Sequence, residues 1–386
     1  MDIAHHGQLD AAVDELFKGT TFLPDTDMSR FETLLEHVSR NRFTTFTVLY
    51  AELYKLFAEV ERLSDFFDQA VELIVLPKRE QYPIVNDPVF QIWVGQAFRD
   101  TNHILTAKVE GTAELEKTVS GFTGMLSRVK ARHASGVIPV EPPVYRFDAD
   151  PLIMQATPPS YEFPEDDAAR KRLERGVFSS RFFADVVKIA LLRIEHTWPD
   201  CREQIRHLVK SICFLPDGTF RSCSASRYTG VVLLASRDES ILDLEESLVH
   251  EATHQLLYHV VEVAPVVEPQ ASQEATFSLP WSGQKRDLYG YFHAFYVYVA
   301  LVKYMERVRS RSAEELKRAQ NRMLFIVRGL IRALPDLEGS PDFTRHGRQL
   351  LDNLAAEVRA MESRHAGLLA ITAPLSAALP VLGATA

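Results

Sequence analysis

Apolar residues recur at three- and four-residue spacing along most of this chain, and that period predicts amphipathic helices. The period is clear from residue 8 to about residue 134, so we expect a helical N-terminal domain over residues 1–135. It returns after residue 166 and dominates the C-terminal third, where the expected helices cover residues 286–307, 312–334 and 342–363. The fold should therefore be mainly α.

Two stretches lack the helical period. Residues 136–165 are rich in proline, which predicts an extended linker. Residues 207–235 contain β-branched and alternating runs separated by turn residues such as Asp217-Gly218, which predicts a small β-sheet. The expected class is α+β, with the sheet inside a second domain that covers residues 166–386 and includes the C-terminal helices.

The charge and cysteine content exclude several classes of protein. A formal net charge of -9 argues against a general nucleic-acid or membrane-surface binder, which normally carries a basic excess. The cysteines have no CxxC spacing, so they suggest neither a disulfide framework nor a thiolate zinc site. The N-terminus lacks the pattern of a signal peptide, and no apolar run reaches the ~20 residues of a membrane span. We expect a cytoplasmic protein.

The segment LVHEATHQLLYH follows the expected sheet and contains an HExxH motif, His250-Glu251-Ala252-Thr253-His254. On a helix, residues four apart differ by about 40° in azimuth, so His250 and His254 project from one face. Two imidazoles placed in this way can share one metal ion, with Glu251 beside them. The motif and the sheet before it together indicate a zincin-like catalytic part.

Two histidines rarely complete a metal site, so a third ligand is required. The metzincin extension is absent, because Leu257 and Val260 stand where that motif needs glycine and histidine. The remaining candidates for the third ligand are Glu262, Glu268, Glu274 and His293. His293 is the strongest of them. A lone histidine in the apolar helix pattern that begins near Trp281 is usually a core residue, but Arg286 falls on the same face of that pattern.

Arg286 precedes His293 by seven residues in the same pattern, which predicts a separation of two helical turns, about 10 Å, on one face. An arginine so placed needs an anion as its partner. Three neutral ligands and an arginine suit a non-haem iron site that holds an anionic cosubstrate. 2-Oxoglutarate could bind iron(II) through its keto-acid end and pair its far carboxylate with Arg286.

The segments SCSASRYTGVVLLAS, LVHEATHQLL and LPWSGQKRDLYGYFHAFYVYVALV together resemble a family over roughly residues 205–310. This family is that of the HExxH-type peptide-modification proteins, which are encoded with ribosomally made peptide natural products. Some members are 2-oxoglutarate-dependent iron peptide β-hydroxylases. The resemblance implies that His250, His254 and His293 bind iron, that Arg286 binds the cosubstrate, and that Glu251 orients a ligand or water.

The same resemblance implies a ribosomal precursor peptide as substrate, lying along residues 221–235 near Ser222, Ser224, Ser226 or Arg227. For these four residues a solvated strand face is an equal alternative. Family members often have proline after the arginine, where this chain has Asp287.

Two other classes of protein stay open. A zinc metallopeptidase would use Glu251 as the general base on zinc-bound water. A non-enzymatic helical scaffold would use its histidines structurally and the N-terminal helices as a docking surface. The sequence also leaves open whether those helices bind a leader segment, a second copy of the chain in a homodimer, or nothing.

Overall fold

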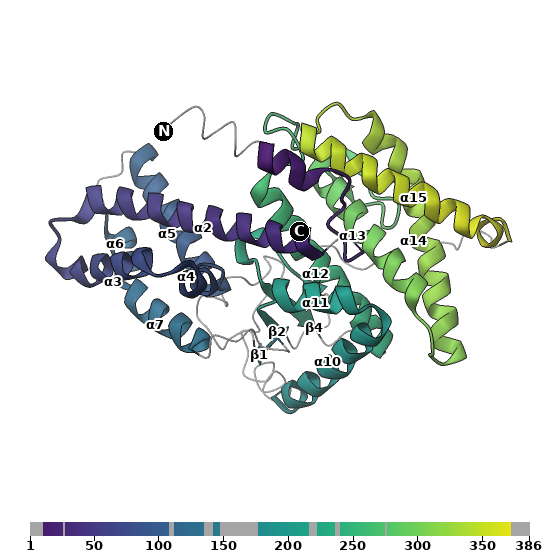
Figure 1. Ribbon diagram of the computed structural model, residues 1–386, viewed down its shortest axis with the longest axis horizontal. Coiled ribbons are helices and arrows are strands. Elements are labelled where there is room, and N and C mark those ends of the chain that lie inside the picture. The colour runs from purple at the N-terminus through teal and green to yellow at the C-terminus, as the bar shows by residue number, and fades with distance from the viewer. Residues whose placement is uncertain are drawn as a thin grey trace, which may run out of the picture.

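Helices make up most of the computed structural model of the protein, as the apolar period predicts (Figure 1). The structure describes residues 11–25, 28–107, 112–134, 142–146, 177–215, 222–235, 240–274 and 276–371. Within these ranges, no helix is both long and apolar enough to cross a lipid bilayer.

The short helix at residues 11–17, the first purple segment in Figure 1, packs into the core of the C-terminal helices. The other N-terminal helices, purple to blue, gather on one side of the molecule. They are α2 (Met28–Phe57), η1 (Glu61–Leu63), α3 (Ser64–Val75), α4 (Lys78–Val85), α5 (Pro88–Ala107), α6 (Ala113–Ser120) and α7 (Phe122–His133). The helical character expected before residue 135 is therefore confirmed. Residues 111–134 do not form the single helix that their period suggests, because Gly121, a weak helix former, separates α6 from α7.

The small sheet expected before the HExxH helix is present. Its strands are β1 (Val144–Arg146), β2 (Ser211–Leu215), β3 (Ser222–Cys223) and β4 (Val231–Ala235). They lie in the order β1-β2-β4-β3, with β1, β2 and β4 parallel and β3 antiparallel at one edge. Strand β1 falls within residues 136–165, expected to be a linker, and most of that segment lies outside the described residues.

The two faces of the sheet pack into two different hydrophobic cores. Ile212 and Val232 belong to the core built on the C-terminal helices. Cys213 and Leu233, one residue further along each strand, belong to the core of the N-terminal helices. This alternation follows from the period of two in a strand, and it makes the sheet the layer between the two sets of helices. The proposed domain boundary near residue 135 stays a prediction.

The remaining helices surround the HExxH segment, and Figure 1 shows α14 and α15 on the side opposite the N-terminal helices. The elements are α10 (Val177–Thr197), α11 (Pro199–Leu208), α12 (Ile241–Val263), β5 (Phe277–Ser278), β6 (Lys285–Arg286), α13 (Leu288–Arg307), α14 (Ala313–Gly339) and α15 (Arg345–Ile371). The three expected C-terminal helices are confirmed, although the first begins at Leu288 rather than at residue 286.

Helix α12, which carries the HExxH motif, is anchored through a fully buried carboxylate. Glu245 Oε1 lies 2.5 Å from Arg193 Nε of α10, and its other oxygen lies 3.4 Å from Arg311 Nη2. The hydroxyl of Tyr304 on α13 also donates to Glu245. Because a buried charge requires partners, these contacts fix where α12 lies between its neighbours.

Candidate metal centre

His250 and His254 lie one turn apart on α12, as their spacing predicts. Ser240 caps this helix, since its hydroxyl oxygen accepts a hydrogen bond from the Asp243 backbone N–H at 3.2 Å. The Nε2 atoms of the two histidines are 2.9 Å apart. The His250 side chain is buried, with 8% of its surface exposed.

His293 reaches the pair from α13. Its Nε2 atom lies 2.5 Å from His254 Nδ1, and the two ring centroids are 4.4 Å apart. The structure therefore brings together the three imidazoles that the sequence singled out, although 39 residues separate His254 from His293.

The other candidates for a third ligand are not part of this cluster. Glu262 lies at the far end of α12 and pairs with Arg42 of α2, with 2.8 Å between Nη2 and Oε2. Glu268 lies after α12, where its backbone N–H donates to the Asp342 carbonyl, and Glu274 is exposed. His293 is thus the one of the four candidates that contacts the HExxH pair.

The chemistry of this donor set fits a transition metal. Burial lowers the pKa of His254 to about 3 and that of His293 well below its ordinary value, so both rings are neutral, the form that binds metals. The donor atoms are not converged on one point, because His254 faces His293 with Nδ1 and His250 with Nε2. Accordingly, no set of three potential ligands among the described residues already has metal-binding geometry. A small rotation of the His254 ring would be needed.

Glu251 is turned toward the sheet. Its carboxylate accepts hydrogen bonds from Ser224, at 2.6 Å, and from Ser222. Burial raises the pKa of Glu251 to about 7, although both hydroxyls favour the charged form and oppose the shift. The four residues proposed to lie near the peptide therefore differ in exposure. Ser222 and Ser224 are buried against Glu251, whereas Ser226 and Arg227 are exposed.

Three tyrosines surround the imidazoles, and the sequence had given them no role in the site. The ring centroids of Tyr258 and Tyr289 lie 5.1 Å and 5.4 Å from that of His293, and the Tyr298 ring lies 6.1 Å from His250. Their spacing was a usable signal, because Tyr258 follows His254 by four residues and Tyr289 precedes His293 by four.

The expected position of Arg286 is wrong. Arg286 lies in β6, paired with β5, and not on the helix of His293, because Asp287 caps α13 by accepting a hydrogen bond from the Gly290 N–H at 2.8 Å. The arginine stem folds over Gly290, where a Cβ atom would lie 3.1 Å from Arg286 Cδ. Gly290 precedes His293 by three residues, about 4.5 Å along the helix axis, so the arginine stays near the cluster.

The guanidinium of Arg286 donates to the Lys285 carbonyl at 3.2 Å and to the Gln284 amide oxygen at 3.0 Å. Both acceptors belong to the same hairpin as the arginine. A dicarboxylate that bound to Arg286 would have to compete with these neutral acceptors, which form weaker hydrogen bonds to arginine than a carboxylate does.

In the comparisons with known proteins, no family model matches this chain and no curated protein is significantly similar to it. The function of the chain must therefore be inferred from the side chains of the cluster and from their chemistry.

Proposed function

We propose that this chain is a cytoplasmic non-haem iron(II) oxygenase that hydroxylates the β-carbon of a side chain in a ribosomally made precursor peptide. The observation that carries the proposal is that three imidazoles meet, two of them neutral, while the Glu251 carboxylate is held by serine hydroxyls. Iron(II) sites of oxygenases leave three positions open beside three protein ligands. When bound, iron with 2-oxoglutarate would supply the oxidation: dioxygen gives one oxygen to the peptide and one to succinate, and carbon dioxide is released.

The chain's own residues would orient and enclose the reactants. His250, His254 and His293 would hold the metal, and Tyr258 and Tyr289 would exclude water from one side. Glu251 would keep α12 in register with β3 through Ser224, which supports the metal ligands from behind.

Arg286 would bind the far carboxylate of 2-oxoglutarate. Its stem crosses α13 one turn before His293, and its guanidinium can exchange the hairpin oxygens for a carboxylate. The arginine stem lies over Gly290, one helical turn before His293. This short separation favours the role, since the cosubstrate must span only from the metal to a neighbouring turn.

Strand β3 is the candidate surface for the peptide. It lies at one edge of the sheet order, and Ser224, directly after it, contacts Glu251 beside the metal ligands. An extended peptide can add to such an edge by main-chain hydrogen bonds, which places its side chains near the next layer.

A zinc metallopeptidase is the second candidate, and the pKa of Glu251 favours it. A carboxylate with a pKa of about 7 is suited to act as a general base on metal-bound water. The two serine hydroxyls that hold this carboxylate favour the oxygenase instead, because they occupy it away from a water.

The first test is anaerobic titration of metal-free protein with ferrous iron and then with 2-oxoglutarate. We expect one iron per chain and a weak visible charge-transfer band when the cosubstrate is added. His293→Ala should abolish the band, whereas His196→Ala, at an exposed histidine of α10, should leave it intact. Tight zinc binding without any such band, together with peptide cleavage that Glu251→Gln abolishes, would establish the peptidase.

The role of Arg286 has its own test. Arg286→Ala should leave iron binding unchanged and weaken 2-oxoglutarate at least tenfold, because a charge-assisted hydrogen bond contributes about 1.5–3 kcal/mol. Lys285→Ala is the matched control, since Lys285 is the exposed neighbour in β6 and its ammonium group donates to the Thr276 carbonyl. Equal affinity for the cosubstrate in both variants would refute the dicarboxylate model.

A further inference from the structure

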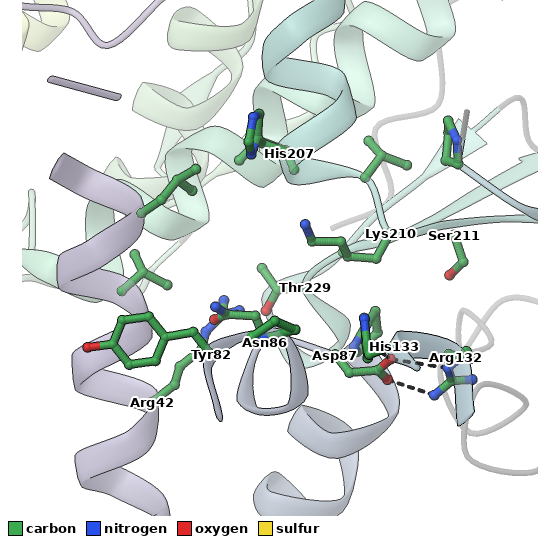
Figure 2. A pocket seen from close by; sticks show the side chains of 18 of the residues that line it. Arg42, Tyr82, Asn86, Asp87, Arg132, His133, His207, Lys210, Ser211 and Thr229 are labelled. Atoms are coloured by element: carbon green, nitrogen blue, oxygen red, sulfur yellow. Dashed lines mark hydrogen bonds and ion pairs between the residues drawn. The ribbon is translucent and has the colours of Figure 1, made fainter. Parts of the chain in front are cut away.

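A cavity of about 650 Å³ lies between the N-terminal helices and the C-terminal part of the chain (Figure 2). Its walls come from α2, α4 and the ends of α5 and α7 on one side, and from the end of α11 and the residues before β2 on the other. None of the three clustered imidazoles lines it. His259, five residues beyond His254 on α12, is the point at which that helix reaches the cavity.

Lys210 points into this cavity from the turn between α11 and β2, as Figure 2 shows. Its ammonium group makes no ion pair and no hydrogen bond with the described residues. The carboxylate that acts on its charge is that of Asp87. Asp87 is already bound by Arg132, at 2.7 Å, and by His133, at 3.0 Å.

The backbone holds Lys210 in this position. Its N–H donates to the Gly230 carbonyl at 2.8 Å, and Gly230 adopts a φ of +92°, which favours glycine. A Cβ atom at residue 230 would lie 2.9 Å from Pro88 Cγ and 3.1 Å from Lys210 Cγ. The missing side chain of Gly230 therefore makes room for the lysine stem.

The arginines around the cavity are neutralised by carboxylates of the protein. Arg42 pairs with Glu262 at 2.8 Å, and Arg206 pairs with Glu203. Arg79 lies 3.4 Å from Glu80. Lys210 differs from them, because its charge has no dedicated partner among the described residues although its side chain is largely buried.

An ammonium group in this environment is costly. Burial, with a contribution from Arg42, lowers the pKa of Lys210 to about 8. A bound anion would remove this cost, since it would supply the missing opposite charge.

Apolar side chains form much of the remaining wall. They are Leu35, Val38, Tyr82, Pro83, Pro88 and Val209. Cavities of this size with an apolar lining and one convergent charge are typical small-molecule sites. The wall therefore suits a ligand with an apolar body.

We propose that this cavity binds a small organic anion whose carboxylate or phosphate group pairs with Lys210 and whose apolar body lies against α2 and α4. The site is distinct from the histidine cluster and does not depend on the identity of the metal. It would place a ligand at the junction of the N-terminal helices and the sheet.

The test uses 8-anilinonaphthalene-1-sulfonate, a fluorescent aromatic anion, with the full-length protein. We expect saturable binding of one molecule per chain. Lys210→Met should weaken it roughly tenfold, the effect of losing one charge-assisted hydrogen bond. Lys210→Arg should retain most of the affinity, and Lys317→Met, at an exposed lysine of α14, should retain all of it.

The neutral analogue N-phenyl-1-naphthylamine is the matched ligand control, and it should bind the wild type and Lys210→Met equally. Displacement of the dye by decanoate would identify a carboxylate site, and displacement by phenyl phosphate would identify a phosphate site. Unchanged dye affinity in Lys210→Met, or no displacement by either anion, would overturn the proposal.

Discussion

Glu251 is a buried carboxylate whose nearest partners are neutral hydroxyls. Its side chain is 2% exposed, and Ser224 and Ser222 donate to it without supplying positive charge. The folded protein therefore binds a proton at this position more tightly than the unfolded chain does, and its pKa rises from 4.5 to about 7. Because an acid with a raised pKa is destabilising when ionised, Glu251 should lower stability as the pH rises from 4.5 through 7.

Glu251→Gln should therefore stabilise the metal-free protein at pH 8. We expect a gain of about 3 kcal/mol in the free energy of unfolding, since the pKa of Glu251 rises from 4.5 to about 7 and each pH unit corresponds to about 1.4 kcal/mol. The gain should nearly vanish at pH 4.5, where the wild-type carboxyl is protonated. Urea denaturation at both pH values measures this, with the exposed Glu195→Gln as control. Equal stability of mutant and wild type at pH 8 would contradict this prediction, since it would show that other groups compensate the charge of the Glu251 carboxylate.

Helices α13 and α14 are joined by aromatic packing that extends to the histidine cluster. The Trp281 ring lies 4.2 Å from that of Tyr298, which faces His250. Trp281 donates through Nε1 to the Ile326 carbonyl of α14 at 3.2 Å. This packing requires glycine at residue 329, because a Cβ atom there would lie 1.9 Å from Trp281 Nε1.

Gly329→Ala should lower the free energy of unfolding by about 2–3 kcal/mol, the usual cost of overpacking a core. Gly367→Ala is the matched control in α15, where a Cβ atom would meet nothing within 4 Å. That change should stabilise the protein by about 0.5–1 kcal/mol, since alanine favours a helix. Thermal unfolding of both variants tests the contrast, and a harmless Gly329→Ala would contradict the packing.

The two cores meet at the sheet and at α12, and buried histidines lie along that junction. His259 is 6% exposed, and its ring Nδ1–H donates to the Gln255 carbonyl at 2.7 Å. Burial lowers the pKa of His259 to about 3, and His293 is affected in the same direction. The unfolded chain takes up protons on these rings below pH 6.5 and the folded chain does not, so acid should favour unfolding.

Metal-free protein should therefore lose stability between pH 6.5 and pH 5. At pH 5 the rings of His254 and His259, each with a pKa of about 3, cost about 2 kcal/mol apiece, and His293 acts in the same direction. Protonation of Glu251 returns about 2 kcal/mol, so the histidines prevail. We expect a net loss of at least about 2 kcal/mol in urea denaturation. Added metal should oppose this loss until the ligands protonate. A urea midpoint that is equal at pH 6.5 and pH 5 would disprove the account.

Features that depend on local period could be predicted from the amino-acid sequence. Helical spacing predicted most helices and placed His250 and His254 on one face, and β-branched runs predicted the sheet before them. His293 was identified by its helix pattern and by the resemblance, and the structure brings it to His254.

Contacts between distant segments could not be predicted from local spacing, because they depend on how the elements pack. Arg286 matched the period of α13, yet the cap at Asp287 ends the helix before it, and pairing with β5 places it in a hairpin. Packing of strands against helices places Ser224 where it donates a hydrogen bond to Glu251. The same packing directs the Lys210 side chain into a cavity. Local spacing fixes the direction of a side chain on its own element, but its partner is set by packing that joins residues far apart in the chain.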